Sequence, residues 1–429
     1  MPQSVTGNSM DAQGFIYRQT LPYPMRPECC IKRMPKGGGV NSGEVMDDVM
    51  WYGLRGKMMG APTRYNDMTV IAVRVRNGDR LSAQSESLVS VEATRVLPVR
   101  SGGAWAVETP TRDIVPWFLY IAKSAGYTDA DLDLPELDRL HDVYRARGDT
   151  FDMTIDDAST VKDAMNDALA AGFSELTINR GLLLPVRDEP RTQFEHMYTP
   201  QNMTKGLKRQ LVFPSSDDFD GVDVEYFSSI TWAWETVECR WAGDLGNKVE
   251  KVKVPGISDR TRAWRIGMRR RGHQKFRNDT YRWETELDAL NSGYMSYAAV
   301  ADDVPGYGQS SILLSVESVP GGIALESTEP FDWSAGGPHV IALRRQDGTL
   351  SGPWPATQVD DYRVSVNSLD FDPDTSWDPV PPHLLFGPVN RWSYPTLVTV
   401  VNPSSGGNVT VEGMPYDARV YQYDNSAPT

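Results

Sequence analysis

Hydrophobic positions in residues 256–287 change their period once, close to Asp279. Before this point, small and apolar side chains recur at the spacing of one helix face, namely Ala263, Trp264, Gly267, Met268 and Gly272. Ser258 or Asp259 can cap this helix, because a side-chain oxygen there accepts from the free N–H groups of the first turn. After Asp279 the period becomes two, which predicts a one-sided strand with Tyr281, Trp283, Thr285 and Leu287 on its apolar face.

Helical spacing recurs in one other part of the chain, residues 111–172. Asp113 is placed to cap a first helix that stops near Gly126. A second is predicted over residues 134–147, with Gly148 in the left-handed conformation after it. A third follows the caps Ser159 and Thr160 and runs through Ala171.

The rest of the chain favours strands. Residues 176–178 and 182–186, joined by a turn that contains Gly181, predict a hairpin. Pro and Gly punctuate the C-terminal third, as expected of a small barrel or sandwich. Further strands are predicted over residues 68–76, 88–97, 150–155, 222–226, 232–241, 311–319, 322–325, 340–343, 362–366, 397–401 and 409–411.

These patterns predict a multi-domain α+β protein that is mainly β, with tube-like β-barrel domains and one helical insertion domain. The predicted divisions are an extended N-terminal segment (1–45), a first β segment (46–110), the helical insertion (111–190), a second β segment with the arginine-rich helix (191–308) and a C-terminal barrel or sandwich (309–429).

Composition limits the class of partner. The chain has 429 residues and a net charge of −14, so general binding to nucleic acid is not expected, and self-association through acidic and basic patches is favoured. No apolar stretch approaches the ~20 residues that cross a bilayer, and the N-terminus has no hydrophobic signal core. These features predict a soluble polypeptide made in the cytoplasm.

The sequence contains no motif that indicates a cofactor or a metal. It has no GxSxG, P-loop or GxGxxG pattern, and its five histidines lack metal-binding spacing. Cys29, Cys30 and Cys239 form neither a disulfide framework nor a four-cysteine zinc site, so buried or free thiols are expected. No catalytic residue and no cofactor is therefore predicted.

Three weaker signals have a simpler interpretation beside the functional one. Glu195 next to His196 could serve acid–base chemistry, but a single neighbouring pair is ordinary. Residues 370–378 carry four aspartates, yet Pro373 and the lack of a terminal Glu argue for a solvated loop rather than a calcium site. The tripeptide Arg147-Gly-Asp149 matches an adhesion motif and equally the end of a helix.

Arginines are dense on the helix that follows Asp259. Arg262, Arg265 and Arg269 flank its apolar stripe, beside Trp264. Three interpretations are open: ion pairing between subunits or domains, a solvated cationic face, and contact with nucleic acid. The first is favoured, so these four residues are the predicted assembly interface.

The same helix resembles one family of viral proteins. Residues 255–265, Pro-Gly-Ile-Ser-Asp-Arg-Thr-Arg-Ala-Trp-Arg, are similar to the "GITDRxQAW" helix of the tail-hub, or tip attachment protein J, family of long-tailed bacteriophages. The strand Thr-Tyr-Arg-Trp-Glu-Thr-Glu-Leu (280–287) and residues 300–305 follow in the family's order. Further similar stretches, in the same order along the chain, are residues 91–98, 146–152, 159–164, 186–202 and 420–424, the last resembling the family's closing strand.

The resemblance spans roughly Trp51 to the C-terminus and implies a homotrimeric hub that closes the distal end of the tail tube of a siphovirus virion. Implied partners are tail-tube and distal-tail proteins, the tape-measure protein, and tail-fibre or receptor-binding proteins. DNA would pass through the lumen without specific binding during ejection. The longest members continue into fibronectin-like modules and a receptor-binding fibre, which are not seen before Thr429, so direct receptor binding is not expected of this polypeptide.

Two rival classes remain beside the structural hub. A hub-associated peptidoglycan hydrolase would use Glu195, His196 or the carboxylates of residues 370–378. A receptor-binding adhesin would use the loop-rich C-terminal third.

Overall fold

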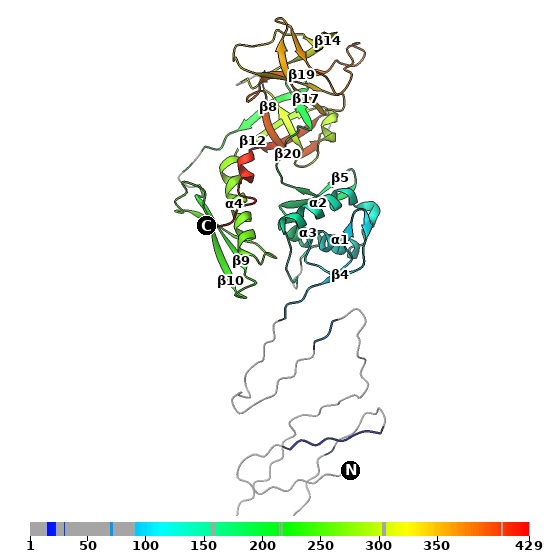
Figure 1. The fold of residues 1–429 in the computed structure, drawn as a ribbon, viewed down its shortest axis with the longest axis vertical. Helices are drawn as coiled ribbons and strands as arrows, with labels where there is room; N and C mark the ends of the chain where they lie inside the picture. The colour runs from blue at the N-terminus through cyan, green and yellow to red at the C-terminus, as the bar shows by residue number, and fades with distance from the viewer. Residues whose placement is uncertain are drawn as a thin grey trace, which may run out of the picture. The chain divides into compact units, whose positions relative to one another are not determined.

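A computed structural model describes residues 15–22, 30, 69–71, 91–155, 159–213, 215, 218–302, 306–404 and 406–428. The chain divides into two compact units, Met1–Ser90 and Val91–Thr429. The second unit contains all the helices and strands described below (Figure 1). The strand predicted over residues 68–76 and the predicted N-terminal segment lie largely outside the described residues.

Three α-helices and a hairpin form the helical part of the second unit. The first helix follows Asp113, whose side chain makes no capping hydrogen bond, so that predicted cap is wrong. Thr160 caps the third helix through a capping box, and Gly148 follows the second with φ of 72°. The hairpin turns at Arg180 and Gly181, both with positive φ. The elements are α1 (Ile114–Ser124), α2 (Leu134–Arg147), α3 (Val161–Ala170), β5 (Ser174–Asn179) and β6 (Leu182–Arg187), with a short 3-10 turn, η1 (Asp129–Asp131), before α2. The predicted helices and hairpin are thus confirmed.

Two of the predicted strands near this part are largely absent. Of residues 91–97, only β1 (Val96–Leu97) is a strand, paired with β4 (Thr109–Pro110); β2 (Arg100–Ser101) pairs with β3 (Ala104–Trp105). In residues 150–155, Thr150 alone forms a bridge, to Asp113. Phe151 instead packs under Gly256, and its backbone N–H donates to Arg112 O. The segment's bonds go to separate loops rather than to one neighbouring strand, which explains the wrong prediction.

A six-stranded sheet collects strands from distant parts of the sequence. Its order is β7-β13-β20-β21-β12-β8, with β7 parallel to β13 and the other pairs antiparallel. Two longer segments are therefore insertions: one between β8 and β12, and one between β13 and β20. The strands are β7 (His196–Tyr198), β8 (Met203–Gln210), β12 (Thr280–Thr285), β13 (Tyr297–Val300), β20 (Tyr394–Pro403) and β21 (Val409–Pro415).

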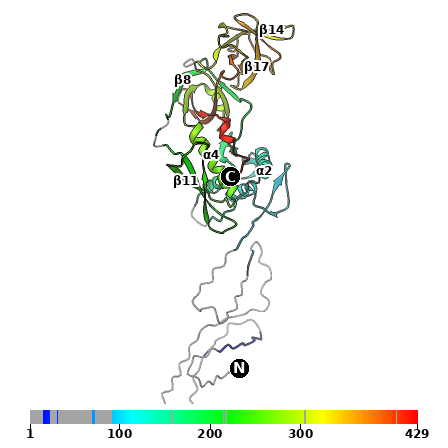
Figure 2. The same ribbon diagram turned by 60° about the vertical axis from the view of Figure 1, so that its left-hand side comes forward.

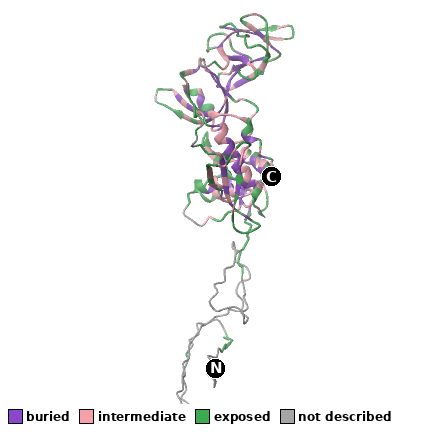
Figure 3. Ribbon diagram, turned by 90° about the vertical axis from the view of Figure 1, so that its left-hand side faces the viewer, coloured by how far each residue is buried: buried purple, intermediate pink, exposed green. Residues whose placement is uncertain are grey.

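The second insertion is a closed antiparallel barrel of order β14-β15-β18-β17-β16-β19. Its interior is filled by buried apolar side chains such as Leu313, Ile341 and Phe386, and Figure 3 colours buried stretches along the strands. The strands are β14 (Gln309–Val319), β15 (Gly322–Ser327), β16 (His339–Arg344), β17 (Leu350–Gln358), β18 (Arg363–Val366) and β19 (His383–Pro388). The predicted C-terminal range 309–429 is thus divided, because β20 and β21 return to the six-stranded sheet.

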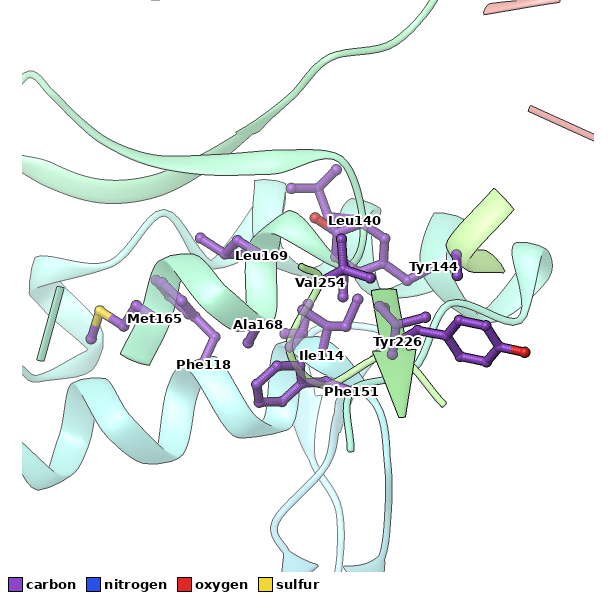
Figure 4. Close-up of a cluster of buried hydrophobic side chains, with 14 of the residues drawn as sticks. Ile114, Phe118, Leu140, Tyr144, Phe151, Met165, Ala168, Leu169, Tyr226 and Val254 are labelled. Atoms are coloured by element: carbon purple, nitrogen blue, oxygen red, sulfur yellow. The ribbon is translucent and has the colours of Figure 1, made fainter. Parts of the chain in front are cut away.

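The first insertion carries the arginine-rich helix, α4 (Arg260–Phe276), on a three-stranded sheet of order β10-β9-β11. Val222, Val224 and Tyr226 alternate with polar residues along β9 and are buried. They share one hydrophobic core with α1–α3, so the helical part and this sheet pack against each other through these side chains (Figure 4). The strands are β9 (Gly221–Phe227), β10 (Trp234–Cys239) and β11 (Val249–Lys253).

Two segments that are predicted as strand form 3-10 turns instead. They are the end of the predicted strand 280–287 and the residues near the C-terminus. The strand ends at Thr285, and Leu287 is exposed in the 3-10 turn η2 (Leu287–Asn291). The predicted closing strand over residues 420–424 is wrong, because Ala418–Tyr421 forms a 3-10 turn, η3, that contacts α4. The described architecture is nevertheless α+β and mainly β, as predicted.

Candidate assembly interface around the arginine-rich helix

The apolar stripe of α4 packs on the three-stranded sheet, as its spacing predicted. Asp259 caps the helix by accepting from Arg262 N at 2.9 Å. Ala263, Gly267, Met268 and Gly272 are buried, and Trp264 is half-buried. A methyl group on Gly267 would lie 2.3 Å from Cys239 Sγ, so the helix can approach the sheet this closely only without a side chain at that position.

The arginines beside the stripe are largely inside the molecule. Arg262 and Arg269 have only 8% and 4% of their surface exposed. Arg262 donates to Thr150 Oγ1 at 3.0 Å and to Ala171 O at 3.2 Å, and lies 3.7 Å from an oxygen of Asp149. The guanidinium therefore ties α4 to the loop after α2 and to the end of α3.

Arg269 joins α4 to the C-terminal segment. Its Nε donates to Asp424 Oδ1 at 3.1 Å, and its Nη2 donates to the other carboxylate oxygen. Its Nη1 donates to Asp188 O at 2.7 Å. This two-pronged contact matches the planar guanidinium to the planar carboxylate and is the strong form of an ion pair. In Figures 1 and 2 the C-terminus lies beside α4.

The contacts of α4 with the segments around it are called the junction below. Within it, Asp188, just after β6, accepts hydrogen bonds from the end of α4 and from the C-terminal segment. Arg277 donates to its two oxygens at 2.7 and 3.1 Å, and Tyr421 Oη donates to Oδ1 at 2.7 Å. His273 Nε2 lies 3.0 Å from Oδ2. Burial alone would raise the pKa of Asp188, but the hydrogen bonds of His273 and Arg277 and the nearby positive charges hold that pKa far below its usual range.

The outer side of α4 is paired with the loop and strand at its flank. Asp244 accepts from Nε and Nη2 of Arg271, both at 2.8 Å, and from Lys275 at 3.1 Å. Burial opposes ionisation, yet these bonds and that from Trp241 N lower the pKa of Asp244 to about 2. Arg270 makes a more exposed two-pronged pair with Glu250.

Trp264 and Arg265 keep part of their surface accessible. Arg265 Nε donates to Ser426 O at 2.8 Å, and Trp264 meets the ring of Tyr423 edge to face at 5.7 Å. Both residues are half-buried. Of the three interpretations of the arginine-rich helix, these contacts correspond to pairing between parts of the same chain. Contact between subunits through Arg262, Trp264, Arg265 and Arg269 stays a prediction.

The nucleic-acid interpretation loses four of its candidate donors at this helix. A phosphate contact needs guanidinium groups that are free to neutralise it, whereas Arg262, Arg269, Arg271 and Arg277 are buried. Each of them lies within 4 Å of a carboxylate oxygen of the same chain.

Of the three weaker sequence signals, one lies at this junction and two lie away from it. Asp149 of the Arg-Gly-Asp tripeptide is 4% exposed and accepts from Arg147 at 2.9 Å, so the helix-end interpretation is confirmed. Glu195 is exposed, while His196 is buried and burial lowers its pKa. In residues 370–378, Asp370 accepts from Ser351 Oγ and Arg345, and Asp374 from Ser376 N.

The two cysteines that the structure describes are free thiols. Cys239 is a buried free thiol whose pKa is raised to about 12 by burial, and Cys30 is free and exposed; Cys29 lies outside the described residues. Within the described ranges no group of three or more His, Cys, Asp or Glu side chains is arranged to hold a metal ion. In the same ranges, no helix is long and apolar enough to span a bilayer.

The pairing of this junction was partly missed by sequence reasoning. Asp188, Asp244, Asp424 and Tyr421 are as important as the arginines, yet none was singled out. Their only signal was an arginine-rich helix in an acidic chain, which requires carboxylates somewhere but does not locate them.

Comparison with known proteins gives no family assignment. No family model and no curated protein matches the sequence. Among solved structures, it aligns over 72% of its length with a chain of the "Virion of native gene transfer agent (GTA) particle", at 12% identity and a TM-score of 0.40. Half of it aligns with a tail protein from Neisseria meningitidis MC58 (11%, TM-score 0.28) and half with the prophage MuSo2 43 kDa tail protein from Shewanella oneidensis (13%, TM-score 0.31). The alignments cover 48%, 57% and 65% of those three chains.

Proposed function

We propose that this chain is a structural virion protein that forms the central hub of a long-tailed bacteriophage tail tip, acting as a homotrimer without catalytic residues of its own. It would close the tail tube, organise distal-tail and host-attachment proteins, and open for DNA ejection. It would be made in the host cytoplasm and reside at the distal end of the tail.

The observation that carries this proposal is the agreement between sequence resemblance and architecture. The resemblance to the tail-hub family implies β-barrel domains interrupted by one helical insertion. The described residues contain a closed six-stranded barrel, a separate six-stranded sheet and a single helical part between β4 and β7. Such a framework holds surfaces at fixed positions, which suits an assembly role.

The arginine-rich helix supports the same role through rigidity. Buried, hydrogen-bonded ion pairs fix the relative position of the segments that they join, since any other arrangement leaves a charge unpaired in the interior. At α4 they join the helical part, the three-stranded sheet and the C-terminal segment. A hub that links host attachment to opening of the tube needs segments that are held in fixed relative positions.

Electron microscopy of phage particles decorated with antibody against this chain tests the proposal directly. We expect label at the distal tail tip, and a purified chain whose mass by light scattering is that of a trimer. Label on the capsid or along the whole tail would contradict the hub assignment. A zymogram on host cell walls addresses the hydrolase alternative: clearing that is lost on Glu195→Gln would overturn the absence of catalysis.

A further inference from the structure

A polar cavity of about 230 Å³ lies between the helical part and the segment that leads into β13. It is lined by α2, the hairpin β5–β6, residues 191–195 and residues 291–296. Figure 1 shows α2 beside β5, one strand of this hairpin. The cavity is smaller than the several hundred Å³ typical of sites for drug-sized ligands, so it suits a single small group.

Three arginines line the cavity, and two of them are paired with carboxylates. Arg139 donates to both oxygens of Glu136 at 2.8 Å and to Glu189 at 2.9 Å. Arg187 Nη1 donates to the other oxygen of Glu189 at 3.0 Å, and its Nε donates to Gly172 O at 3.1 Å. Two glutamates thus balance the charges of two guanidinium groups.

The third arginine, Arg191, has no such partner among the described residues. Its Nη2 donates to Arg187 O at 3.4 Å, a long contact, and its Nε is buried without an acceptor. Nη2 of Arg187 also lacks an acceptor, although Arg187 is only 5% exposed. Guanidinium N–H groups left without acceptors in a buried position are costly, so this part of the cavity wall has hydrogen-bond donors to offer a ligand.

Glu195 is the remaining carboxylate on the cavity wall. It is exposed, and its Oε1 is 3.4 Å from Tyr297 N. Among the ion pairs of the described residues, none joins it to Arg187 or Arg191. Glu195 therefore stands at the cavity as a negative charge that a bound anion would have to approach.

We propose that the cavity binds one carboxylate group, with Arg191 as its principal ligand. A planar guanidinium matches a carboxylate through two parallel hydrogen bonds. A doubly charged phosphate is disfavoured because Glu136 and Glu195 share the wall. Asn179 and Ser296 on the same wall are neutral side chains with donor groups, whereas Asn291 Nδ2 donates to Asp347 O at 3.0 Å. The carboxylate comes either from a small free acid or from an acidic side chain of a peptide, and the site stands independently of the proposed tail-hub function.

Isothermal titration calorimetry on the full chain distinguishes the two sources. Acetate represents the free acid, and a capped tripeptide with one central glutamate represents the peptide, both at constant ionic strength. Millimolar or tighter binding of either probe supports the site. Binding of acetate alone identifies a small acid, and binding of the tripeptide alone identifies a protein segment. If neither probe binds, the proposal is overturned.

Three variants locate the binding. Arg191→Gln should weaken affinity about tenfold or more, the value of a charge-assisted hydrogen bond, while Arg180→Gln, exposed in the turn of the same hairpin, should leave it unchanged. Glu195→Gln should strengthen binding, because it removes the opposing charge; a merely structural role of Arg191 does not predict this gain. Equal affinity of Arg191→Gln and the parent would overturn the assignment. Should Arg191→Gln prove unfolded by its Tm, unchanged affinity of Glu195→Gln would do so instead.

Discussion

Arg269 and Asp424 are 155 positions apart in the chain and form a buried two-pronged ion pair that fixes the C-terminal segment against α4. The side chains of both are less than one tenth exposed. The pair is also supported from the side, because the Arg269 guanidinium lies 4.3 Å from the ring centre of Phe173 and 4.5 Å from that of Tyr421. A single side chain thus connects three segments.

Removing this guanidinium should destabilise the chain strongly. Arg269→Met keeps much of the side-chain volume but leaves Asp424 buried without its counter-charge, at a cost of about 3–5 kcal/mol in the free energy of unfolding. Urea unfolding followed by tryptophan fluorescence measures it. The matched control is Arg270→Met on the same helix, whose pair with Glu250 is more than half exposed on the arginine side and should contribute less than about 1 kcal/mol. Similar losses in the two variants would contradict the assignment.

The close approach of α4 to its sheet gives a second prediction. Gly267→Ala gains helix propensity, but its methyl group would lie within 2.6 Å of Val224 Cγ2 and nearer still to Cys239 Sγ, so we expect a net loss of about 1–3 kcal/mol. Gly206→Ala in β8 is the control, because no described heavy atom lies within 4 Å of the added carbon. Thermal unfolding of both variants measures the difference. A more stable Gly267→Ala variant would show that the helix can move away from the sheet without penalty.

Local patterns in the sequence predicted most helices and many strands correctly. The cap at Asp259 and the stripe through Gly267 follow from spacing and side-chain chemistry alone. Strands without a continuous apolar face were missed: β8 has only Met203 and Leu207 packed against a core, and β17 contains Gly352, Pro353 and Pro355. These strands exist because of their neighbours in the sheet or barrel, and such pairings do not appear in a local pattern.

For the arginine-rich helix, local spacing accounts for the burial of the arginines but does not locate their partners. Arg262 and Arg269 are seven positions apart, so they lie on one face, beside the apolar stripe that packs inward. Their burial follows from that geometry once the stripe is known. Asp149 supplies the counter-charge of Arg262. Asp188 and Asp424 bind Arg269 and lie 81 and 155 positions from it in the sequence. Local spacing cannot identify partners at that separation.

Acid should weaken the junction in a defined range of pH. Because the pKa of Asp244 is about 2 in the folded chain and roughly 3.9 when unfolded, its pairing stabilises the fold above about pH 4, and this contribution is lost as the pH falls toward 2. It amounts to about 2–3 kcal/mol. The pKa of Asp188 is lowered in the same direction and adds a loss that extends to lower pH.

Unfolding measured from pH 6 to pH 2 separates these contributions. Asp244→Asn should be less stable than the parent at pH 6 and should lose less stability on acidification. Asp218→Asn, near the same part of the chain, serves as the exposed control and should follow the parent curve. If Asp244→Asn and the parent lost stability in parallel, the lowered pKa of Asp244 would be contradicted.

The predicted assembly interface can be tested at Arg265, which keeps accessible surface. Arg265→Glu reverses a half-buried charge that, among the described residues, donates to Ser426 O, so we expect the fold to persist while the proposed trimer weakens. Light scattering across a dilution series measures the trimer, and circular dichroism checks the fold. Arg262→Glu is the contrasting variant: its guanidinium is buried next to Asp149, and the change should unfold the junction before any effect on association can be seen. A folded Arg265→Glu chain that forms the parent's trimer at every concentration would exclude this face of α4 from the subunit contact.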